Sequence, residues 1–316
     1  MTTVHGSSQR ALLEAAAEGL RRLATDSRCL AGFAAPDSPL RDVLSPAARR
    51  YVLAPDREGF LAESARLRAL GYRVTAEFTG SGPEEEVVGE YLALLGHEDA
   101  PDQVGFDLLA VGLGHSPARA RENAGRVAAA AAERGGEIVL SMERYATVDA
   151  ALTVQRELSR RYGNVGLTLQ AHLHRTERDA AEVARPGCRI RLVKGAFPEP
   201  AHRALGRGPA LDDRYLRLAQ LLVERGVRLS LATQDPAVLA AAEDSGLLAS
   251  VAEIEMRYGV QPGLLRTHHE AGRPCRINAT YGTNWWLHLL QRLTEHPPMV
   301  LDALADIGTT HPTSPY

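Results

Sequence analysis

The chain contains the stretch Arg189-Ile190-Arg191-Leu192-Val193-Lys194-Gly195-Ala196-Phe197, a β-prone run that ends in a lysine and a glycine. Lys194 is the only lysine of the chain, since the other cationic side chains among its 36 are arginines. A lysine kept where arginine serves everywhere else predicts a role that needs a compact ammonium group. The two residues that precede it are apolar, so Lys194 is expected to close a buried strand.

Similar β-prone runs, most of them followed by a helical stretch, recur after residue 71, and this alternation favours parallel strands. Eight runs are expected: 72–78, 106–112, 137–142, 165–171, 188–194, 227–232, 249–256 and 275–280. Helical partners are expected at 84–95, 117–133, 147–162, 211–224, 236–245 and 285–295. Eight βα units predict an α/β fold, a closed (β/α)8 TIM-like barrel. A doubly wound sheet is the alternative, but no Gly-x-Gly-x-x-Gly motif follows an early strand.

The regions outside this repeat divide the chain into three parts. Residues 1–70 are predicted to form an N-terminal helical segment packed on the barrel, with helices at 9–23, 46–52 and 57–70. Residues 71–310 are predicted to form the barrel, and the Pro-rich end at 311–316 a loose tail.

The composition excludes several classes of protein. With 316 residues, 45% of them apolar, and a formal net charge of -3, the chain can bury a large core and gives no electrostatic argument for nucleic-acid binding. No apolar run approaches the ~20 residues that span a bilayer, and the first residues do not resemble a signal peptide. Cys29, Cys188 and Cys275 are odd in number and widely spaced, which argues against a disulfide framework or a cysteine-rich zinc site. We therefore expect a cytoplasmic protein without a membrane span, and the sequence leaves peripheral membrane contact and the oligomeric state open.

In such a barrel the active site lies where the strands end, so polar residues that close the runs are candidate site residues. They are Glu77, Ser141, Glu143, Gln170, His172, Arg191, Lys194, Thr233, Gln234, Glu253, Glu255, Arg257, Arg276 and Asn278. Arg191 and Lys194 fall on opposite faces of an ideal strand, so both reach one ligand only if the strand bends or Lys194 lies in the following turn.

The last predicted helix carries Trp285, His288, Arg292 and Glu295 on one face, with Gln291 beside it, and its first turn is expected to overhang the barrel mouth. Metal binding is not expected, because neither His268-His269 nor His172-x-His174 has a third ligand at a recognisable spacing. A lysine that closes a barrel strand could also be a Schiff-base nucleophile, which keeps a lyase as a rival interpretation of Lys194.

Several ordered motifs resemble those of the proline dehydrogenase family, a flavin-binding (β/α)8 barrel that oxidises proline to pyrroline carboxylate. The resemblance covers about residues 72–297. Its segments are Arg191 to Phe197, similar to RLVKGAY; Gln170 to Leu173, similar to QAYL; Ala232 to Asp235, similar to ATH followed by Asn or Asp; Glu253 to Gly259, similar to EFQMLYG; and Arg276 to Leu293, similar to RIYVPYG with W-x-x-Y-x-x-RRL.

The resemblance implies FAD as cofactor and a largely retained FAD site. The positions that match the family's FAD contacts are Gln170, Arg191, Val193, Lys194, Gly195, Ala196, Thr233 and Glu295, with Gln234 where the family has histidine.

The positions that surround proline in the family are largely changed. Asn278, His288 and Phe197 stand for tyrosines, and Arg257 for a leucine. Gln291-Arg292 keeps one arginine of a carboxylate-binding pair, residues 108–112 contain no lysine, and Glu77 and Ser81 replace Asp and Glu. The predicted substrate contacts are Phe197, Arg257, Asn278, His288, Gln291 and Arg292.

We therefore expect an FAD-dependent oxidoreductase that dehydrogenates a small amine, imino acid or hydrazine-type substrate with a carboxylate, at a C–N or N–N bond, other than proline and in specialised metabolism. Hydride would pass to flavin N5, Arg191 and Lys194 would stabilise the charge of the reduced ring, and His288 would take the substrate proton. Quinone or oxygen would reoxidise the flavin. The alternatives are a genuine proline dehydrogenase, a flavin-free lyase that uses Lys194, and a non-catalytic scaffold.

Overall fold

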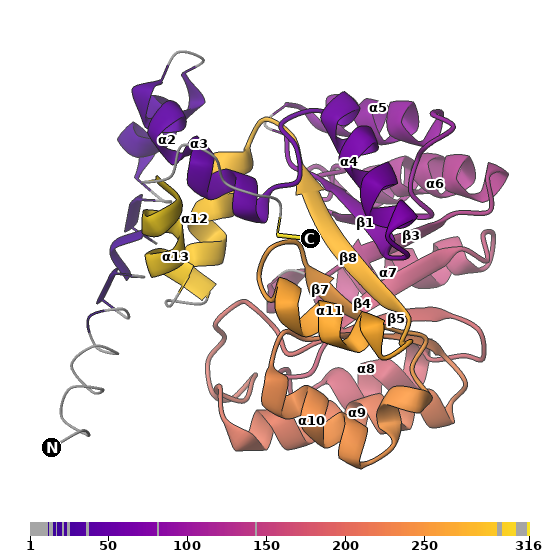
Figure 1. Ribbon diagram of the computed structural model, residues 1–316. Coiled ribbons are helices and arrows are strands. Elements are labelled where there is room, and N and C mark those ends of the chain that lie inside the picture. Colours follow the sequence, from indigo (N-terminus) through magenta and orange to yellow (C-terminus); the bar gives the residue numbers. More distant parts are fainter. Residues whose placement is uncertain are drawn as a thin grey trace, which may run out of the picture.

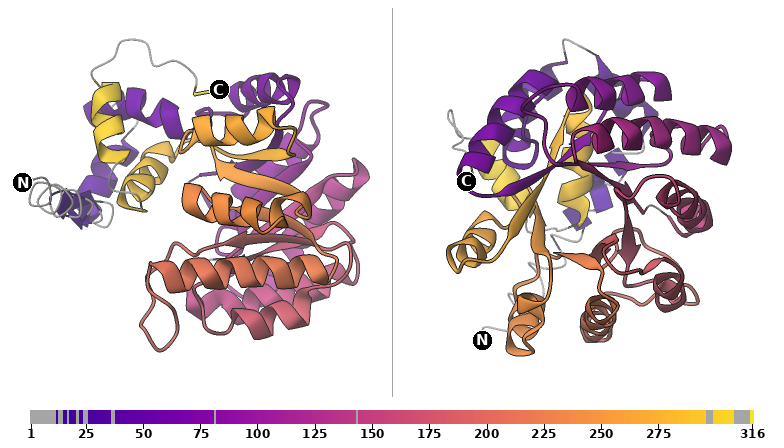
Figure 2. Two further views of the ribbon diagram at one scale, coloured as in Figure 1. Left: turned by 60° about the horizontal axis from the view of Figure 1, so that its bottom comes forward. Right: turned by 90° about the vertical axis from the view of Figure 1, so that its right-hand side faces the viewer.

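Eight parallel strands form a closed barrel in the order in which they occur in the chain, as the sequence predicts. The computed structural model describes residues 12, 15–16, 18–20, 22–23, 26–35, 38–80, 82–142, 144–295, 299–307 and 315–316. The strands are β1 (Arg73–Phe78), β2 (Gln103–Asp107), β3 (Glu137–Ser141), β4 (Val165–Gln170), β5 (Arg189–Val193), β6 (Arg228–Ala232), β7 (Glu253–Arg257) and β8 (Cys275–Tyr281). β8 pairs with β1 from Arg73↔Arg276 to Phe78↔Tyr281, which closes the barrel. The helices surround these strands (Figure 2, right).

Two strands differ from their predicted ranges by more than one residue at an end. β2 ends at Asp107, five residues before the end predicted from the apolar pattern, because the chain turns there and the Ala110 N–H bonds to the Asp107 carboxylate. The apolar run that follows packs as turns, so hydrophobicity alone could not separate strand from turn. β7 begins at Glu253, and a short 3-10 helix, Leu247–Ala249, takes up the start of its predicted run.

Helix α4 (Arg57–Ala69) precedes β1, and one helix lies between each pair of consecutive strands. These connecting helices are α5 (Glu84–Leu95), α6 (Pro117–Glu133), α7 (Val148–Ser159), α8 (Thr176–Val183), α9 (Pro209–Glu224), α10 (Pro236–Asp244) and α11 (Pro262–Glu270). The 3-10 turn Tyr145–Thr147 precedes α7. No helix is predicted for α8 or α11, which are only 8 and 9 residues long and too short for a clear 3.6-residue period.

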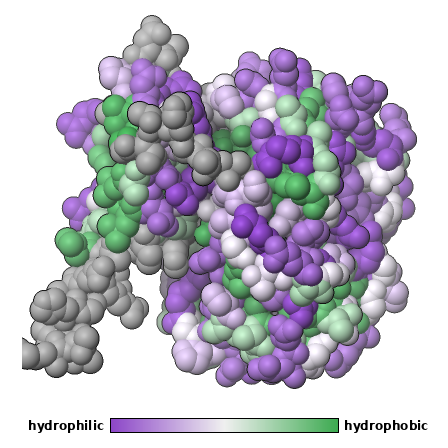
Figure 3. Space-filling view, viewed as in Figure 1, coloured by the Kyte–Doolittle hydropathy of each residue, from purple (hydrophilic) through white to green (hydrophobic). Residues whose placement is uncertain are grey.

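In the described part of the chain, a second unit beside the barrel, which we call the helical unit, contains α2 (Ser27–Ala34), α3 (Pro39–Tyr51), α12 (Trp285–Glu295) and α13 (Met299–Ile307) (Figure 1). Tyr51 of α3 packs with Trp286 and Leu289 of α12 in a separate apolar cluster. Apolar side chains also gather on the surface of this unit (Figure 3). Residues far apart in the sequence thus share one core.

The predicted start of a helix at Pro46 is wrong, because α3 begins at Pro39 and contains Pro46 in its interior. Pro39 occupies the first helical turn, where no N–H is needed, and Pro46 costs a single internal hydrogen bond. The predicted helix at 9–23 lies mostly outside the described residues. Of the predicted tail, the structure describes Pro315 and Tyr316, and the Tyr316 ring packs 5.6 Å from the rings of Tyr72 and Tyr258. The division at residues 70 and 310 stays a prediction.

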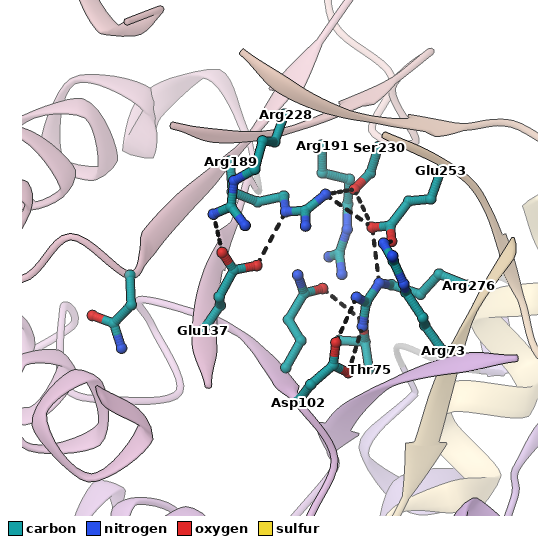
Figure 4. Close-up of polar contacts among 12 residues, drawn as sticks. Arg73, Thr75, Asp102, Glu137, Arg189, Arg191, Arg228, Ser230, Glu253 and Arg276 are labelled. Atoms are coloured by element: carbon teal, nitrogen blue, oxygen red, sulfur yellow. Dashed lines mark hydrogen bonds and ion pairs between the residues drawn. The ribbon is translucent and has the colours of Figure 1, made fainter. Parts of the chain in front are cut away.

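A network of charges with a buried centre lies at the end of the barrel where the strands begin (Figure 4). The Glu253 carboxylate is fully buried and accepts hydrogen bonds from Arg276 at 2.8 Å, Arg189 at 3.1 Å and Ser230 at 2.6 Å. Arg276 also forms two 3.0 Å bonds to Asp102. Every charge named here has an opposite charge within hydrogen-bonding distance, which buried charges require.

Candidate active site

A cavity of about 670 Å³ opens at the other end of the barrel, where the strands terminate. Residues from all eight strands line it, and His288 and Met299 of the helical unit contribute to its rim. In (β/α)8 enzymes this end of the barrel carries the active site.

Arg191 of β5 is the central cation of the cavity. Its side chain is buried, and it lies 3.1 Å from Glu77 Oε1 and 2.8 Å from Glu255 Oε1. The Asn278 amide donates to the same two carboxylates, at 2.8 and 3.3 Å. Burial disfavours the charged guanidinium, but the charges of Glu255 and Glu77 outweigh it and raise the pKa of Arg191. Arg191 is therefore a permanent positive charge at the floor of the cavity.

Several buried polar atoms around Arg191 have no hydrogen-bond partner among the described residues. They are Arg191 Nη2, Glu255 Oε2, Asn278 Oδ1 and Thr168 Oγ1. Buried polar groups are nearly always paired in folded proteins, and each unpaired group costs about 1–3 kcal/mol. Four such atoms at one cavity indicate a place for a polar ligand.

Lys194 lies in the turn after β5 and not in the strand itself. In that position Lys194 and Arg191 can both face one ligand, which an ideal strand would not allow. Its ammonium is 2.5 Å from Asp212 Oδ1 and 2.6 Å from Asp235 Oδ2. Asp235 also caps α10 by accepting from the Ala237 and Val238 N–H groups. Burial raises the pKa of the Asp235 carboxyl, but the Lys194 hydrogen bond and charge outweigh burial and lower it. Lys194 thus ties the end of β5 to the helices that follow β5 and β6.

Gly195 lets the backbone pass close to a histidine. It has a φ of 114°, and a Cβ built on it would lie 1.8 Å from His172 Nδ1. His172 Nε2 lies 3.2 Å from the Phe197 carbonyl, and its backbone N–H donates to the Lys194 carbonyl at 2.9 Å. Only glycine fits this position, and His172 supports the loop from below.

The structure brings most of the predicted site residues to this one cavity. Lining it are Gln170, Arg191, Val193, Lys194, Gly195, Ala196, Phe197, Thr233, Gln234, Arg257, Asn278 and His288. Arg257 lies 3.6 Å from Glu77, and Arg144 stacks 5.6 Å from the Phe197 ring centre. The predicted contacts Gln291, Arg292 and Glu295 lie on α12, but their side chains fall outside the described residues, as do Ser81 and Glu143.

Two residues predicted at strand ends lie elsewhere. Glu253 opens β7 and Arg276 lies near the start of β8, so both belong to the network at the opposite end of the barrel. The seventh predicted run begins four residues before β7, which places Glu253 too far along that strand. The eighth predicted run begins at Cys275 like β8, so Arg276 is a polar residue near the start of its run and not at its end.

Three acidic residues at the site were missed by sequence reasoning: Asp107, Asp212 and Asp235. Asp235 stands before Pro236 and a helical stretch, which is a helix-capping signal that could have drawn attention to it. Asp107 was hidden because the second strand was placed too far along the chain. Asp212 lies inside a helix, and no local signal separates it from a surface residue.

The paired histidines have local partners. His174 Nε2 lies 2.9 Å from the Ala201 carbonyl, His269 Nε2 lies 3.0 Å from the Leu70 carbonyl, and His268 Nδ1 lies 2.9 Å from Arg273. These contacts explain the histidines as links between chain segments. Among the described residues no helix is long and apolar enough to cross a membrane.

Comparisons with known proteins agree with the motifs. The proline dehydrogenase family model matches residues 62–295. Proline dehydrogenase 1 of Bacillus subtilis (strain 168) is 24% identical over 262 residues, which are 79% of this chain and 87% of that protein. Proline dehydrogenase of Deinococcus radiodurans is 32% identical over 181 residues, which are 55% of this chain and 58% of that protein.

Solved structures show the same fold. Proline utilization A (PutA) from Bdellovibrio bacteriovorus, inactivated by N-propargylglycine, matches with a TM-score of 0.70 at 19% identity and covers 87% of this chain. PutA from Corynebacterium freiburgense matches with a TM-score of 0.63 at 18% identity and covers 96% of this chain. The chain spans 37% and 36% of these two proteins, so the likeness concerns one part of each.

Proposed function

The chain belongs to the proline dehydrogenase family, a family of oxidoreductases, and from that premise we propose that it is an FAD-dependent dehydrogenase of a small amino acid with a secondary amine, with proline as the first candidate. The observation that carries the proposal is Arg191, a buried guanidinium at the floor of the barrel mouth, one of whose nitrogens has no partner in the described part of the chain. The curated relatives are proline dehydrogenases, which favours proline over the non-proline substrate expected from the changed pocket.

The polar atoms of the cavity fit a flavin. Arg191 Nη2 and Thr168 Oγ1 are buried and have no partner among the described residues, and a flavin ring presents acceptor oxygens and nitrogens to such groups. The residues proposed to hold FAD are Gln170, Arg191, Val193, Lys194, Gly195, Ala196, Thr233, Gln234 and Glu295.

FAD would supply a two-electron acceptor for hydride when bound. Arg191 would stabilise the negative charge that develops on the acceptor, and it is already oriented for this by Glu77 and Glu255. Lys194 would add positive charge beside it, and its two carboxylate partners fix the position of the ammonium. The substrate would lie among Phe197, Arg257, Asn278, His288, Gln291 and Arg292.

A second candidate is a small amine or hydrazine with a carboxylate other than proline. Asn278 favours it, because its amide nitrogen donates to Glu77 and Glu255 while its buried oxygen, at the cavity, has no partner among the residues that the structure describes. A substrate with an additional donor group would satisfy that oxygen. Arg257, which is partly exposed beside Glu77, would then contribute to carboxylate binding.

The geometry disfavours a Schiff-base lyase. A lysine nucleophile must be a neutral amine, and two direct ion pairs stabilise the ammonium of Lys194.

The test is the visible spectrum of the purified protein, followed by anaerobic addition of L-proline. We expect a yellow protein whose flavin absorption is bleached by proline. Bleaching by another amine or a hydrazine carboxylate, but not by proline, would support the second candidate. A colourless protein that takes up no FAD would refute the proposal. Reoxidation of the bleached protein by a soluble quinone or by oxygen then identifies the class of electron acceptor.

A further inference from the structure

One carboxylate of the cavity differs from the others in its surroundings. Asp107 is the last residue of β2, where it pairs in register with Ser141 of β3, and it lines the same cavity as Arg191 and Lys194. Its Oδ1 accepts the Ala110 N–H at 2.8 Å, which holds the carboxylate at the mouth. Within the described part of the chain, no cationic side chain forms an ion pair with it.

The other acidic side chains of the cavity already form ion pairs with cationic side chains. Glu77 lies near Arg191, Arg257 and the Asn278 amide. Glu255 is paired with Arg191, and Asp235 with Lys194. Among the described residues of the cavity, Asp107 is therefore the carboxylate that can still pair with the cation of a ligand.

The groups that face Asp107 make it more basic than an ordinary aspartate. Burial raises the pKa of its carboxyl, and backbone N–H groups oppose this only in part. The negative charge of Glu77 on β1 raises the pKa further, and the neutral phenol of Tyr91 lies nearby on α5. On β3 the facing residue, Ser141, does not titrate.

We propose that Asp107 binds the ammonium group of the substrate and takes its proton before hydride transfer. This inference rests on the proposed function. An amine substrate arrives near neutral pH as an ammonium ion, whose nitrogen has no lone pair to form a C=N bond. One proton moves from nitrogen to the Asp107 carboxylate, which frees the lone pair. The hydride, with two electrons, then leaves the adjacent carbon for bound FAD as the C=N bond forms, and Asp107 later returns its proton to solvent.

The experiment compares Asp107→Asn with the wild type and with Asp244→Asn, which changes an exposed carboxylate at the end of α10. Asparagine keeps the oxygen that accepts the Ala110 N–H, so the turn after β2 should be retained. The first readout is the binding of two ligands, monitored by the change in the flavin spectrum. The ligands are L-proline and its oxygen analogue L-tetrahydro-2-furoic acid, which has no ammonium group. The second is the rate of anaerobic flavin reduction by proline as a function of pH.

We expect Asp107→Asn to weaken proline binding but not binding of the oxygen analogue, and to slow reduction by about 10²-fold or more. The wild-type rate should fall on acidification as Asp107 is protonated. In Asp107→Asn this acid limb should move to higher pH, because only substrate that is already a free amine can then react, and in Asp244→Asn it should stay in place. An unchanged acid limb in Asp107→Asn, or one moved instead by His288→Phe, would overturn the inference and leave the proposed function standing. A wild type that holds FAD but is reduced by neither proline, N-methylglycine nor pyrrolidine would overturn both.

Discussion

The two ends of the barrel both contain buried arginines and glutamates, but they treat them differently. At the end where strands begin, Glu253 is surrounded by Arg276, Arg189 and Ser230, and its hydrogen-bonding capacity is used inside the protein. At the end where strands terminate, Arg191 and Glu255 each keep a buried polar atom without a partner among the described residues. The same residue types serve stability at one end and leave capacity for a ligand at the other.

This difference separates structural charges from functional ones. Removing one partner from a complete buried ion network leaves a charge uncompensated and destabilises the fold. A buried polar atom without a partner costs free energy until a ligand pairs with it. Substitutions at the end where the strands begin should therefore change stability, and substitutions at the end where they terminate should change ligand binding and flavin reduction.

Arg276→Met should give the largest loss of stability. It leaves Glu253 with less compensation in a fully buried position, which typically costs about 3–5 kcal/mol. The measurement is urea unfolding of the apoprotein. The control, Arg121→Met, removes an exposed ion pair with Glu157 and should cost about 0–1 kcal/mol. Equal losses for both variants would show that the buried network is not special.

Arg191→Met tests the role of the cation at the end of the barrel where the strands terminate. Loss of a preorganised positive charge that stabilises the developing charge on the acceptor should lower flavin reduction about 10²–10³-fold, or about 2.7–4 kcal/mol. The measurement is the anaerobic reduction rate at saturating substrate. Glu77 and Glu255 lose a partner as well, so unfolding of the same variant must be measured. A rate equal to that of wild type would remove Arg191 from the chemistry.

Acidification should destabilise the ion network at the end of the barrel where the strands begin. Burial opposes the charged form of Glu253, but the charges of Arg276 and Arg189 outweigh it and lower its pKa from the usual 4.5 to about 2. The unfolded chain therefore binds the proton first as the pH falls, and stability is lost between about pH 4.5 and 2, by roughly 3 kcal/mol for this group. Urea midpoints of wild type and Glu253→Gln at pH 5 and pH 3 measure it. The difference between them should shrink at low pH, and a constant difference would contradict the assignment.

The contrast between the ends also explains what the sequence could predict. The β-prone runs and their helices identify the barrel, and polar residues at strand ends identify Arg191, Glu255 and Asn278. Period-2 patterns do not define where a buried strand starts or stops, so Glu253 was assigned to the wrong end and Asp107 was missed. Pairings such as Lys194 with Asp212 join residues on different elements, which no local pattern reports.

The smallest effect is expected for Thr168→Val, and it distinguishes the two ends most directly. Thr168 Oγ1 is buried and unpaired among the described residues, so replacing the hydroxyl with a methyl group should stabilise the apoprotein by about 1 kcal/mol. If the hydroxyl bonds to the ligand, the same change should weaken FAD binding. The matched variant Thr75→Val, at the end where the strands begin, removes a hydroxyl that donates to Gln103 at 2.7 Å. It should destabilise the apoprotein without changing FAD affinity. Opposite signs of the two stability changes are the expected result, because a polar atom that waits for a ligand costs stability in its absence. A loss of stability in both variants would mean that the mouth is satisfied by its own residues.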